Sequence, residues 1–378
     1  MIDYAASGLL QTTFFELLDN QKYSLGDLEG VRSMTRERSI YTSPRTSATL
    51  ELTPQSNIDW GQRRVRAWSV VRFRDGETTD LVPLFTGIPV VSGGSRNAAT
   101  APVSLRLLDF SCYLDAPVGR TYAAAPGATV TQLVRALLAE LGLLDAVITE
   151  SSAPVGSGSF WAGTETYRQV INDLLKSAGY SAIWADEWGR LRVEPYVEPG
   201  SRPVDPDLGF IHGRTCTYKP EFTIEHDTAS VPNVAVITPR ADERVEPPVG
   251  SYTLSPDHPY SAANRNGLVV PYVESGVDLA VQPLPENPAP GDLTEYQTRL
   301  QEAATLYARR ALLSRVEPSR SFVVENRWRP YNLQQATSFY APARGASPEI
   351  RAAVTIAKDS LRYQAGAPLS MTTTLLEV

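Results

Sequence analysis

Few side chains in this sequence are of the types that enzymes use for catalysis. Its 378 residues include three histidines and two cysteines. His212, His226 and His258 are isolated from one another, and the sequence has no HExxH, GxSxG or phosphate-binding glycine loop. Cys112 and Cys216 lie far apart and form no CxxC pair, which favours buried free thiols over a disulfide or a metal site. We therefore expect no catalytic, metal-binding or cofactor-binding residue, and no cofactor.

Three weaker patterns could still carry chemistry. His226 and Asp227 could be a base and the group that orients it, but neighbouring residues on a strand point to opposite faces. Asp257, Asn264 and Asn266 weakly resemble a calcium loop, although the bidentate glutamate and the usual spacing are missing. A glycoside hydrolase would need two carboxylates that the sequence does not pair among its 42 acidic residues. A non-enzymatic protein is the favoured interpretation.

Tryptophan and arginine are the other side chains that could mark a functional surface. Trp188, beside Glu187 in a predicted hairpin turn, is expected to be exposed. Arg309 and Arg310 lie in a basic cluster that either forms a solvated helix face or contacts a neighbouring subunit. We name Arg309, Arg310 and Trp188 as candidate subunit contacts. The six tryptophans, which could form a sugar-binding platform but more readily fill cores and subunit contacts, are Trp60, Trp68, Trp161, Trp184, Trp188 and Trp328.

Charge and hydropathy argue against two classes of partner. The formal net charge is -7, from 42 acidic and 35 basic residues spread along the chain, so no basic face for nucleic acid is evident. The longest apolar stretches, 130–144 and 231–237, fall short of the roughly 20 residues that span a bilayer. The first 18 residues lack the basic start of a signal peptide. We expect folding in a cytoplasm and no membrane insertion.

The spacing of apolar residues and turn residues predicts a mainly β chain. The 29 prolines and 25 glycines are scattered between short apolar runs, as turns between many strands would require. Residues 1–30 are predicted to form an N-terminal arm with a helix over 9–18. Residues 31–117 are predicted to form a first β-barrel with a hairpin turn at 75–77. Its strands are expected at 48–52, 65–74, 81–91 and 103–108.

Residues 118–212 have a helical period and predict a small α+β insert. A helix is expected over 129–142, opening on the capping residue Thr129 and closing on Gly142. A second is expected over 165–178, with Gly179 as its stop. Strands at 180–185 and 190–195 should form a hairpin through a turn at 186–189. The glycine- and serine-rich run 156–159 is expected to be a loop.

Residues 213–378 predict a second β-barrel. A proline- and asparagine-rich passage over 239–290 is expected to be a long surface loop. A helix over 292–315, with capping residues at its start, is expected to pack on the barrel. The strands are predicted at 215–218, 221–224, 233–237, 321–328, 349–358 and 371–378.

The order of these elements resembles that of bacteriophage tail hub proteins, also called baseplate hub or tail-tip hub proteins. Two β-rich domains flanking an α+β insert is an uncommon arrangement. The resemblance covers roughly residues 31–378 and is carried by the order of several short motifs. These are Leu84-Phe85-Thr86-Gly87, Leu105-Arg106-Leu107-Leu108-Asp109, Gly189-Arg190-Leu191-Arg192-Val193, Val231-Pro232-Asn233-Val234-Ala235-Val236-Ile237 and Tyr307-Ala308-Arg309-Arg310-Ala311-Leu312-Leu313.

The resemblance implies a structural virion protein of the tail tip, assembled in the bacterial host cytoplasm. Both barrels would resemble the tail-tube subunit, so a homotrimer would form a pseudo-sixfold ring that joins a sixfold tube to a threefold tip. The implied partners are a distal tail or tail-tube protein above, a central fibre or spike protein below, and the tape measure protein in the channel. DNA would pass without specific binding, past a neutral or acidic lumen. The alternative is a carbohydrate-binding β-sandwich module of a receptor-binding fibre.

Overall fold

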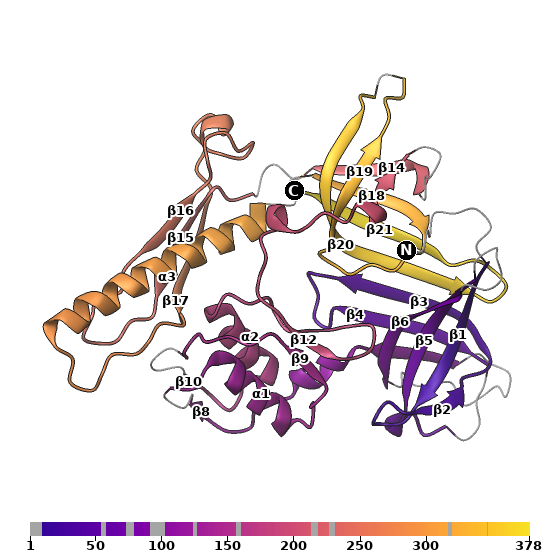
Figure 1. Ribbon diagram of the computed structural model, residues 1–378, viewed down its shortest axis with the longest axis horizontal. Helices are drawn as coiled ribbons and strands as arrows, with labels where there is room; N and C mark the ends of the chain where they lie inside the picture. Colours follow the sequence, from indigo (N-terminus) through magenta and orange to yellow (C-terminus); the bar gives the residue numbers. More distant parts are fainter. Residues whose placement is uncertain are drawn as a thin grey trace.

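One large β-sheet dominates the computed structural model (Figure 1), which describes residues 10–53, 58–72, 79–90, 103–123, 127–155, 160–212, 218–226, 231–316, 320–345 and 347–378. Within these residues the sheet has 13 strands. Its main path runs β14-β18-β21-β20-β3-β4-β7-β6-β5-β1-β2, and β13 and β19 join it through β20. The strands are β1 (Leu10–Leu18), β2 (Ser24–Asp27), β3 (Val31–Ser39), β4 (Thr46–Leu52), β5 (Arg64–Arg72), β6 (Thr79–Val90), β7 (Val103–Leu108), β13 (Phe210–Ile211), β14 (Tyr218–His226), β18 (Arg320–Arg327), β19 (Ala336–Ala341), β20 (Ile350–Gln364) and β21 (Ser370–Glu377).

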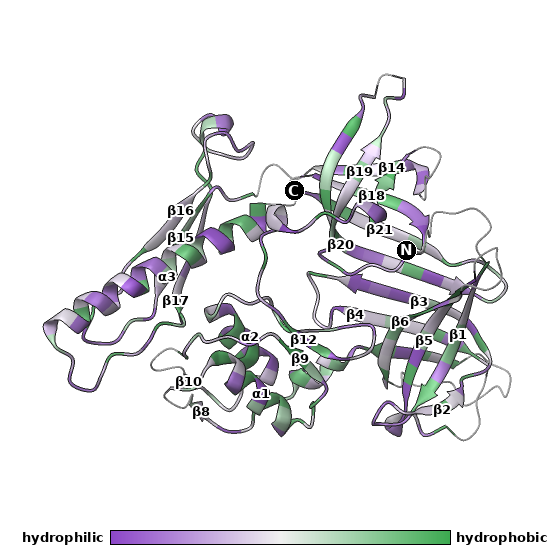
Figure 2. Ribbon diagram, viewed as in Figure 1, coloured by the Kyte–Doolittle hydropathy of each residue, from purple (hydrophilic) through white to green (hydrophobic). Residues whose placement is uncertain are grey.

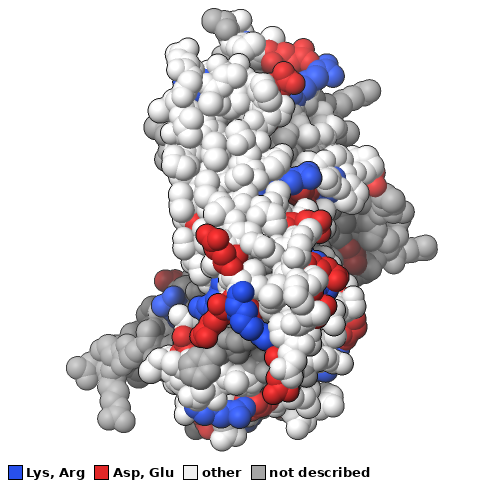
Figure 3. Space-filling view, turned by 90° about the vertical axis from the view of Figure 1, so that its left-hand side faces the viewer, with Lys and Arg blue, Asp and Glu red and all other residues white. Residues whose placement is uncertain are grey.

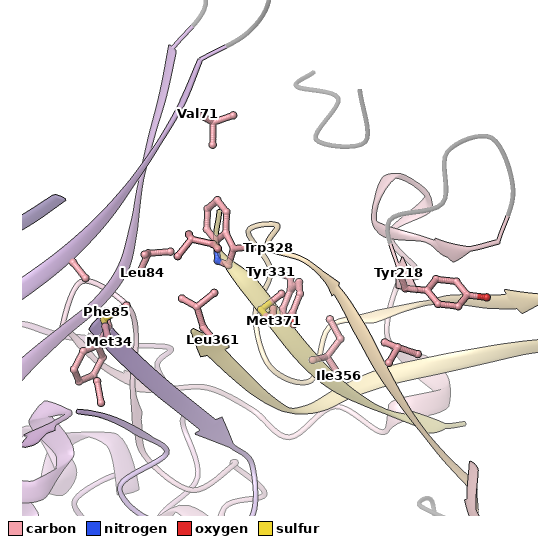
Figure 4. Packing of buried hydrophobic residues seen from close by; sticks show 14 of the residues in the cluster. Met34, Val71, Leu84, Phe85, Tyr218, Trp328, Tyr331, Ile356, Leu361 and Met371 are labelled. Atoms are coloured by element: carbon pink, nitrogen blue, oxygen red, sulfur yellow. Dashed lines mark hydrogen bonds between the residues drawn. The ribbon is translucent and has the colours of Figure 1, made fainter. Parts of the chain in front are cut away.

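The early and late parts of the chain meet between β3 and β20. These two strands pair antiparallel, from Lys358 opposite Ser39 to Gln364 opposite Ser33. One hydrophobic core continues across the junction, with Met34 and Phe85 from the first half and Ile356 from the second (Figure 4). The prediction of a mainly β chain with an α+β insert is confirmed, and the strands of both halves form one continuous sheet.

The predicted N-terminal helix over 9–18 is wrong, because Leu10–Leu18 is strand β1. It pairs antiparallel with β5 along its whole length, from Leu10 opposite Arg72 to Leu18 opposite Arg64. Threonine and phenylalanine favour a strand here, and a short apolar run cannot be assigned to helix or strand from its period alone. β1 and β2 therefore belong to the large sheet and do not form a separate arm.

The insert folds around a core of its own. Its helices are α1 (Val130–Glu140) and α2 (Tyr167–Ser177), both with hydrophobic stretches (Figure 2), and their buried residues belong to one hydrophobic core. Thr129 and Thr166 each begin a helix with a capping box, as expected for α1. The predicted turn at 186–189 joins β11 and β12, whereas the proposed turn at 75–77 and loop at 156–159 lie outside the described residues. The short strands are β8 (Tyr122–Ala123), β9 (Ala146–Ile148), β10 (Phe160–Trp161), β11 (Trp184–Ala185) and β12 (Leu191–Val193).

The predicted long loop over 239–290 is also wrong, because this passage contributes to a third unit. Strands β15 (Val234–Pro239), β16 (Gly250–Thr253) and β17 (Pro271–Val277) form a sheet of order β16-β15-β17. Helix α3 (Pro290–Val316) packs on β15 and β16, where we had expected it on the second barrel (Figure 1). Gly250 permits this close packing, because a Cβ there would lie 2.3 Å from the carbonyl carbon of Ala304. The unit has a separate hydrophobic core.

None of the described helices is long and apolar enough to cross a membrane.

Candidate functional site at the junction of the halves

Three charged side chains are buried where β3 meets β20. Arg36 and Arg38 lie on β3, two residues apart, so both side chains point to the same face of the sheet. Asp359 on β20 lies directly opposite Arg38. Its carboxylate accepts hydrogen bonds from Arg36 Nη2 at 2.7 Å and from Arg38 Nη2 at 2.6 Å and Nε at 2.9 Å. The three residues are between 1% and 5% exposed, so the ion pairs lie inside the protein.

The insert reaches this buried cluster through the turn between β11 and β12. The Glu187 carboxylate forms an ion pair with Arg38. The backbone carbonyl of Glu187 accepts a hydrogen bond from Thr86 Oγ1 at 2.7 Å. Lys22 donates to the carbonyl of Gly189 at 2.7 Å and pairs with Asp145 of the insert at 2.8 Å. The turn thereby contacts the first half of the sheet directly, and it is linked to Asp359 in the second half through Arg38. We call Arg36, Arg38, Glu187 and Asp359 the junction cluster.

Trp188 is exposed, as predicted, yet it also packs against the sheet. It is 41% exposed. Its ring meets that of Trp68 edge to face at a centroid distance of 5.3 Å, and the Arg66 guanidinium lies 5.3 Å from its ring. Gly189 follows at φ 75°, and a Cβ there would lie 2.7 Å from the Phe110 ring. The turn is therefore closely fitted to the sheet.

The electrostatics of the junction cluster keep Asp359 charged. Burial alone would raise the pKa of Asp359, but the charges and hydrogen bonds of Arg36 and Arg38 outweigh burial and hold the pKa below its usual value. Burial, followed by the Asp359 charge, raises the pKa of Tyr331, whose hydroxyl lies 2.7 Å from Thr373 Oγ1. A carboxylate fixed as an anion between two guanidinium groups is a poor proton acceptor. The cluster is therefore suited to holding three parts of the chain together.

A cavity of about 270 Å³ adjoins the cluster. Guanidinium, aromatic and amide groups share its wall, and Arg36, Arg38 and Glu187 of the junction cluster are among them. Its lining residues are Arg36, Arg38, Val82, Pro83, Glu187, Trp188, Trp328, Arg329, Pro330, Tyr331, Asn332 and Gln335.

Arg309 and Arg310 lie at a different contact, between α3 and the insert. Arg309 pairs with Glu198 at 2.9 Å. Arg310 lies over Gly179, where a Cβ would come within 2.1 Å of its Nη1 atom. Both arginines thus contact residues of their own chain, and the structure does not bring them together with Trp188. Their role as subunit contacts stays a prediction.

A glutamate strengthens the contact between the third unit and the insert. Glu274 on β17 pairs with Lys176 of α2 at 2.5 Å and accepts hydrogen bonds from the hydroxyls of Tyr272 at 2.6 Å and Tyr307 at 3.0 Å. Burial would raise the pKa of Glu274, but Lys176 and Tyr272 lower it below the usual value. This contact is polar, in contrast to the shared hydrophobic core of the two sheet halves.

The residues considered for catalysis or metal binding are dispersed. Nδ1 of His258 accepts a hydrogen bond from the Tyr260 backbone N–H at 3.1 Å. Asn264 donates its side-chain amide to two backbone carbonyls, an arrangement that serves the loop itself. Cys112 is a half-buried free thiol, whereas Cys216 and Asp227 lie outside the described residues. No group of three His, Cys, Asp or Glu that could hold a metal is found in the part of the chain that the structure describes.

Sequence reasoning missed the junction cluster, apart from naming Glu187 as a neighbour of Trp188. The available signal was the alternation in β3. Met34, Arg36 and Arg38 lie on its buried face, and the residues between them, Thr35 and Glu37, are exposed. An arginine at a core position requires a buried anion. Asp359 could not be identified as that anion, because it lies 323 residues from Arg36 in sequence.

Comparison with solved structures gives the fold a precedent. No family model and no curated protein matches the sequence. A tail protein from Neisseria meningitidis MC58 superposes with a TM-score of 0.62 at 15% identity, covering 97% of this chain and 96% of that one. The 43 kDa tail protein of prophage MuSo2 from Shewanella oneidensis gives 0.56 at 13% identity, over 96% and 98%.

Prophage tail protein gp18 from Listeria monocytogenes EGD-e gives a TM-score of 0.51 at 14% identity, over 95% of this chain and 94% of that one. The chain has the phage tail-protein fold. At these identities the likeness concerns the fold alone. Because the tail-protein fold spans nearly the whole of each chain, it includes the sheet, the insert and the third unit together.

Proposed function

We propose that this chain is a structural subunit of a phage tail tip, the hub that lies between the tail tube and the central fibre or spike. The observation that carries the proposal is the likeness to solved tail proteins over nearly the full length of both chains. The junction cluster supports it, because buried ion pairs between β3, β20 and the insert would keep the parts of a structural subunit in a fixed arrangement.

The assembled form that we propose is a homotrimer. Strands β1–β7 would be one tube-like half, and β13, β14 and β18–β21 the other. Three copies would then present six similar halves around a channel, which would allow a threefold tip to meet a sixfold tube. Residues 118–212 would be the insert, on the outside of the ring. The partners would be a tail-tube or distal tail protein above, a fibre or spike protein below, and the tape measure protein within.

We further propose that the subunit is not an enzyme and that DNA passes it without specific binding. The excess of acidic residues, 42 against 35 basic ones, supports a lumen that does not attract phosphate. A lumen lined mainly by lysine and arginine would contradict this part of the proposal. Incubation with peptidoglycan or host polysaccharide should release no soluble fragments, and release that depends on one pair of carboxylates would favour a hydrolase.

The alternative of a sugar-binding module has less support. A platform for sugar rings needs several exposed aromatic residues side by side. Of the six tryptophans, Trp68, Trp161 and Trp328 are less than a tenth exposed, and Trp60 and Trp184 are half-buried. Trp188 is the exposed one, and its ring packs edge to face with that of Trp68. Binding of the purified chain to a glycan array would reverse this assessment.

The test is the mass of the purified chain in solution, measured by native mass spectrometry. A trimer of the 41.3 kDa chain, about 124 kDa, supports the hub. A stable dimer or tetramer contradicts the ring, and a chain that stays monomeric even with a tail-tube protein added contradicts it equally.

A further inference from the structure

Among the described residues, the start of β1 is an open sheet edge without protective residues. β1 pairs with β5 on one side, whereas β2 covers its other side only from Glu16 to Leu18. Leu28 donates a hydrogen bond to the carbonyl of Phe15, and no described residue pairs with the outer edge of residues 10–14. This stretch, Leu-Gln-Thr-Thr-Phe, has no charge, proline or glycine. Proteins usually protect such an edge from pairing with other chains, so an unprotected one indicates a partner strand.

A groove of about 580 Å³ runs beside this open edge. Leu10 lies at one wall and is 58% exposed, and Trp328 and Val71 (Figure 4) contribute further apolar surface. Arg327 is the single charged residue among the described residues of the lining. The full lining is Leu10, Gln11, Thr12, Thr13, Val71, Arg327, Trp328, Tyr363, Gly366, Ala367, Pro368 and Leu369. An exposed edge with pockets beside it is the arrangement by which proteins bind an extended strand.

The opposite end of the same sheet carries an open edge with complementary charge. Among the described strands, β14 pairs with β18 alone. Lys219 pairs with Glu325 and Pro220 stands where the register shifts, so the regular open edge of β14 is 222–226. Glu221 and Glu225 are exposed and form no ion pair with a described residue. By contrast, Arg327 lines the groove beside the start of β1, whereas Arg72 lies opposite Leu10 on β5, across the paired side of β1. The open edge of β1 thus has Arg327 beside it, and the regular part of the β14 edge carries Glu225, with Glu221 just before it.

We propose that β14 of a second copy of this chain adds to the open edge of β1, in the groove beside it. The contact is heterologous, since two different edges meet, and repetition around an axis closes it into a ring. Main-chain hydrogen bonds provide the affinity, and the arginine and glutamate side chains set the orientation. The inference rests on the proposed ring and identifies the two edges that close it.

The first test is disulfide cross-linking between copies, with both native cysteines replaced by serine. Thr223→Cys on β14 is combined in turn with Leu10→Cys, Thr12→Cys or Phe14→Cys, which cover three registers along β1. Adjacent strands bring Cα atoms to about 5.5 Å, within reach of a disulfide. At least one of the three pairs should give covalent dimers and trimers on oxidation. Thr223→Cys with Thr253→Cys on β16 is the matched control and should not.

The second test uses charge at Leu10, a side chain exposed enough to change without disturbing the core. Leu10→Glu would face the glutamates of β14 and should raise the concentration at which half of the chain is trimeric by at least tenfold. Leu10→Lys should raise it less. If trimers form but none of the three pairs cross-links, or if the two substitutions act equally, this inference is overturned and the ring remains. If no trimer forms, the proposed ring itself is overturned.

Charged side chains are unevenly distributed on the side of the molecule that carries α3 and the β15–β17 sheet. Figure 3, which looks onto this side, shows a broad area without Lys, Arg, Asp or Glu and charged side chains of both signs around it.

Discussion

Removing the charge of Asp359 should destabilise the protein far more than removing an exposed carboxylate. Asp359→Asn keeps the size of the side chain but leaves Arg36 and Arg38 buried beside an amide. Three charge-assisted hydrogen bonds of 2.6–2.9 Å lose their anionic acceptor, and the amide NH2 group cannot accept from the guanidinium donors. Breaking a buried pair in this way costs roughly 3–5 kcal/mol. We expect a loss of about 4 kcal/mol in the free energy of unfolding.

The matched control is Glu325→Gln. Glu325 pairs with Lys219 at 2.5 Å, but both side chains are exposed, at 46% and 66%. Exposed pairs contribute about 0–1 kcal/mol. The stability of both variants is to be measured by urea unfolding, monitored by tryptophan fluorescence. The dependence of the unfolding free energy on urea concentration should be compared with that of the wild type, because a lower slope would indicate stepwise unfolding of the separate cores. A loss of less than about 1 kcal/mol for Asp359→Asn, equal to that of the control, would refute the argument that the cluster holds the junction together.

The same substitution has a pH dependence whose sign follows from the lowered pKa of Asp359. A carboxylate with a folded pKa below its unfolded value of about 3.9 stabilises the fold above that pH. This stability is lost as the pH falls through the lower folded pKa. The difference between wild type and Asp359→Asn should therefore be constant from about pH 5 to 8 and shrink below about pH 4. A difference that grows on acidification would contradict the assignment.

Three further predictions concern single residues. Gly250→Ala should separate α3 from β16, because its Cβ would lie 2.3 Å from a backbone atom of Ala304, and the rate of hydrogen exchange in α3 should rise. Gly291→Ala is the control and should leave this rate unchanged, because a Cβ there would meet open space. Burial raises the pKa of Cys112 to about 11, so alkylation at pH 8 in a chain lacking the other cysteine should be roughly 100-fold slower than that of a free thiol, and a comparable rate would contradict the burial. Glu187→Gln should speed hydrogen exchange in the β11–β12 turn with a smaller stability loss than Asp359→Asn, since Glu187 is partly exposed; unchanged exchange would refute its role in docking the insert.

Local signals predicted the helices well. α1 begins after Thr129, whose side chain caps Gln132, and the glycines that follow α1 and α2 adopt the positive φ that ends a helix. Capping and a 3.6-residue period depend on residues close in sequence, so one chain suffices to identify them. The turn at 186–189 was predictable for the same reason, as was the exposure of Trp188.

Long-range pairing accounts for the errors. Leu10–Leu18 is a strand because it pairs with β5. The period of so short an apolar run does not distinguish a helix from a strand, although its threonine and phenylalanine residues favour a strand. β16 and β17 are short strands held by β15 and α3 within a proline-rich passage. The junction cluster depends on the register of β3 with β20, which no local pattern encodes. The candidate site was therefore the part least accessible from the sequence.

Electron microscopy of the purified assembly tests the central claim most directly. Averaged views along the axis should show a closed ring with threefold symmetry and six similar lobes around a channel, as three copies with two tube-like halves each would give. A particle with one lobe per subunit, or with a rotational symmetry that is not a multiple of three, would contradict the account of this chain as a tail hub.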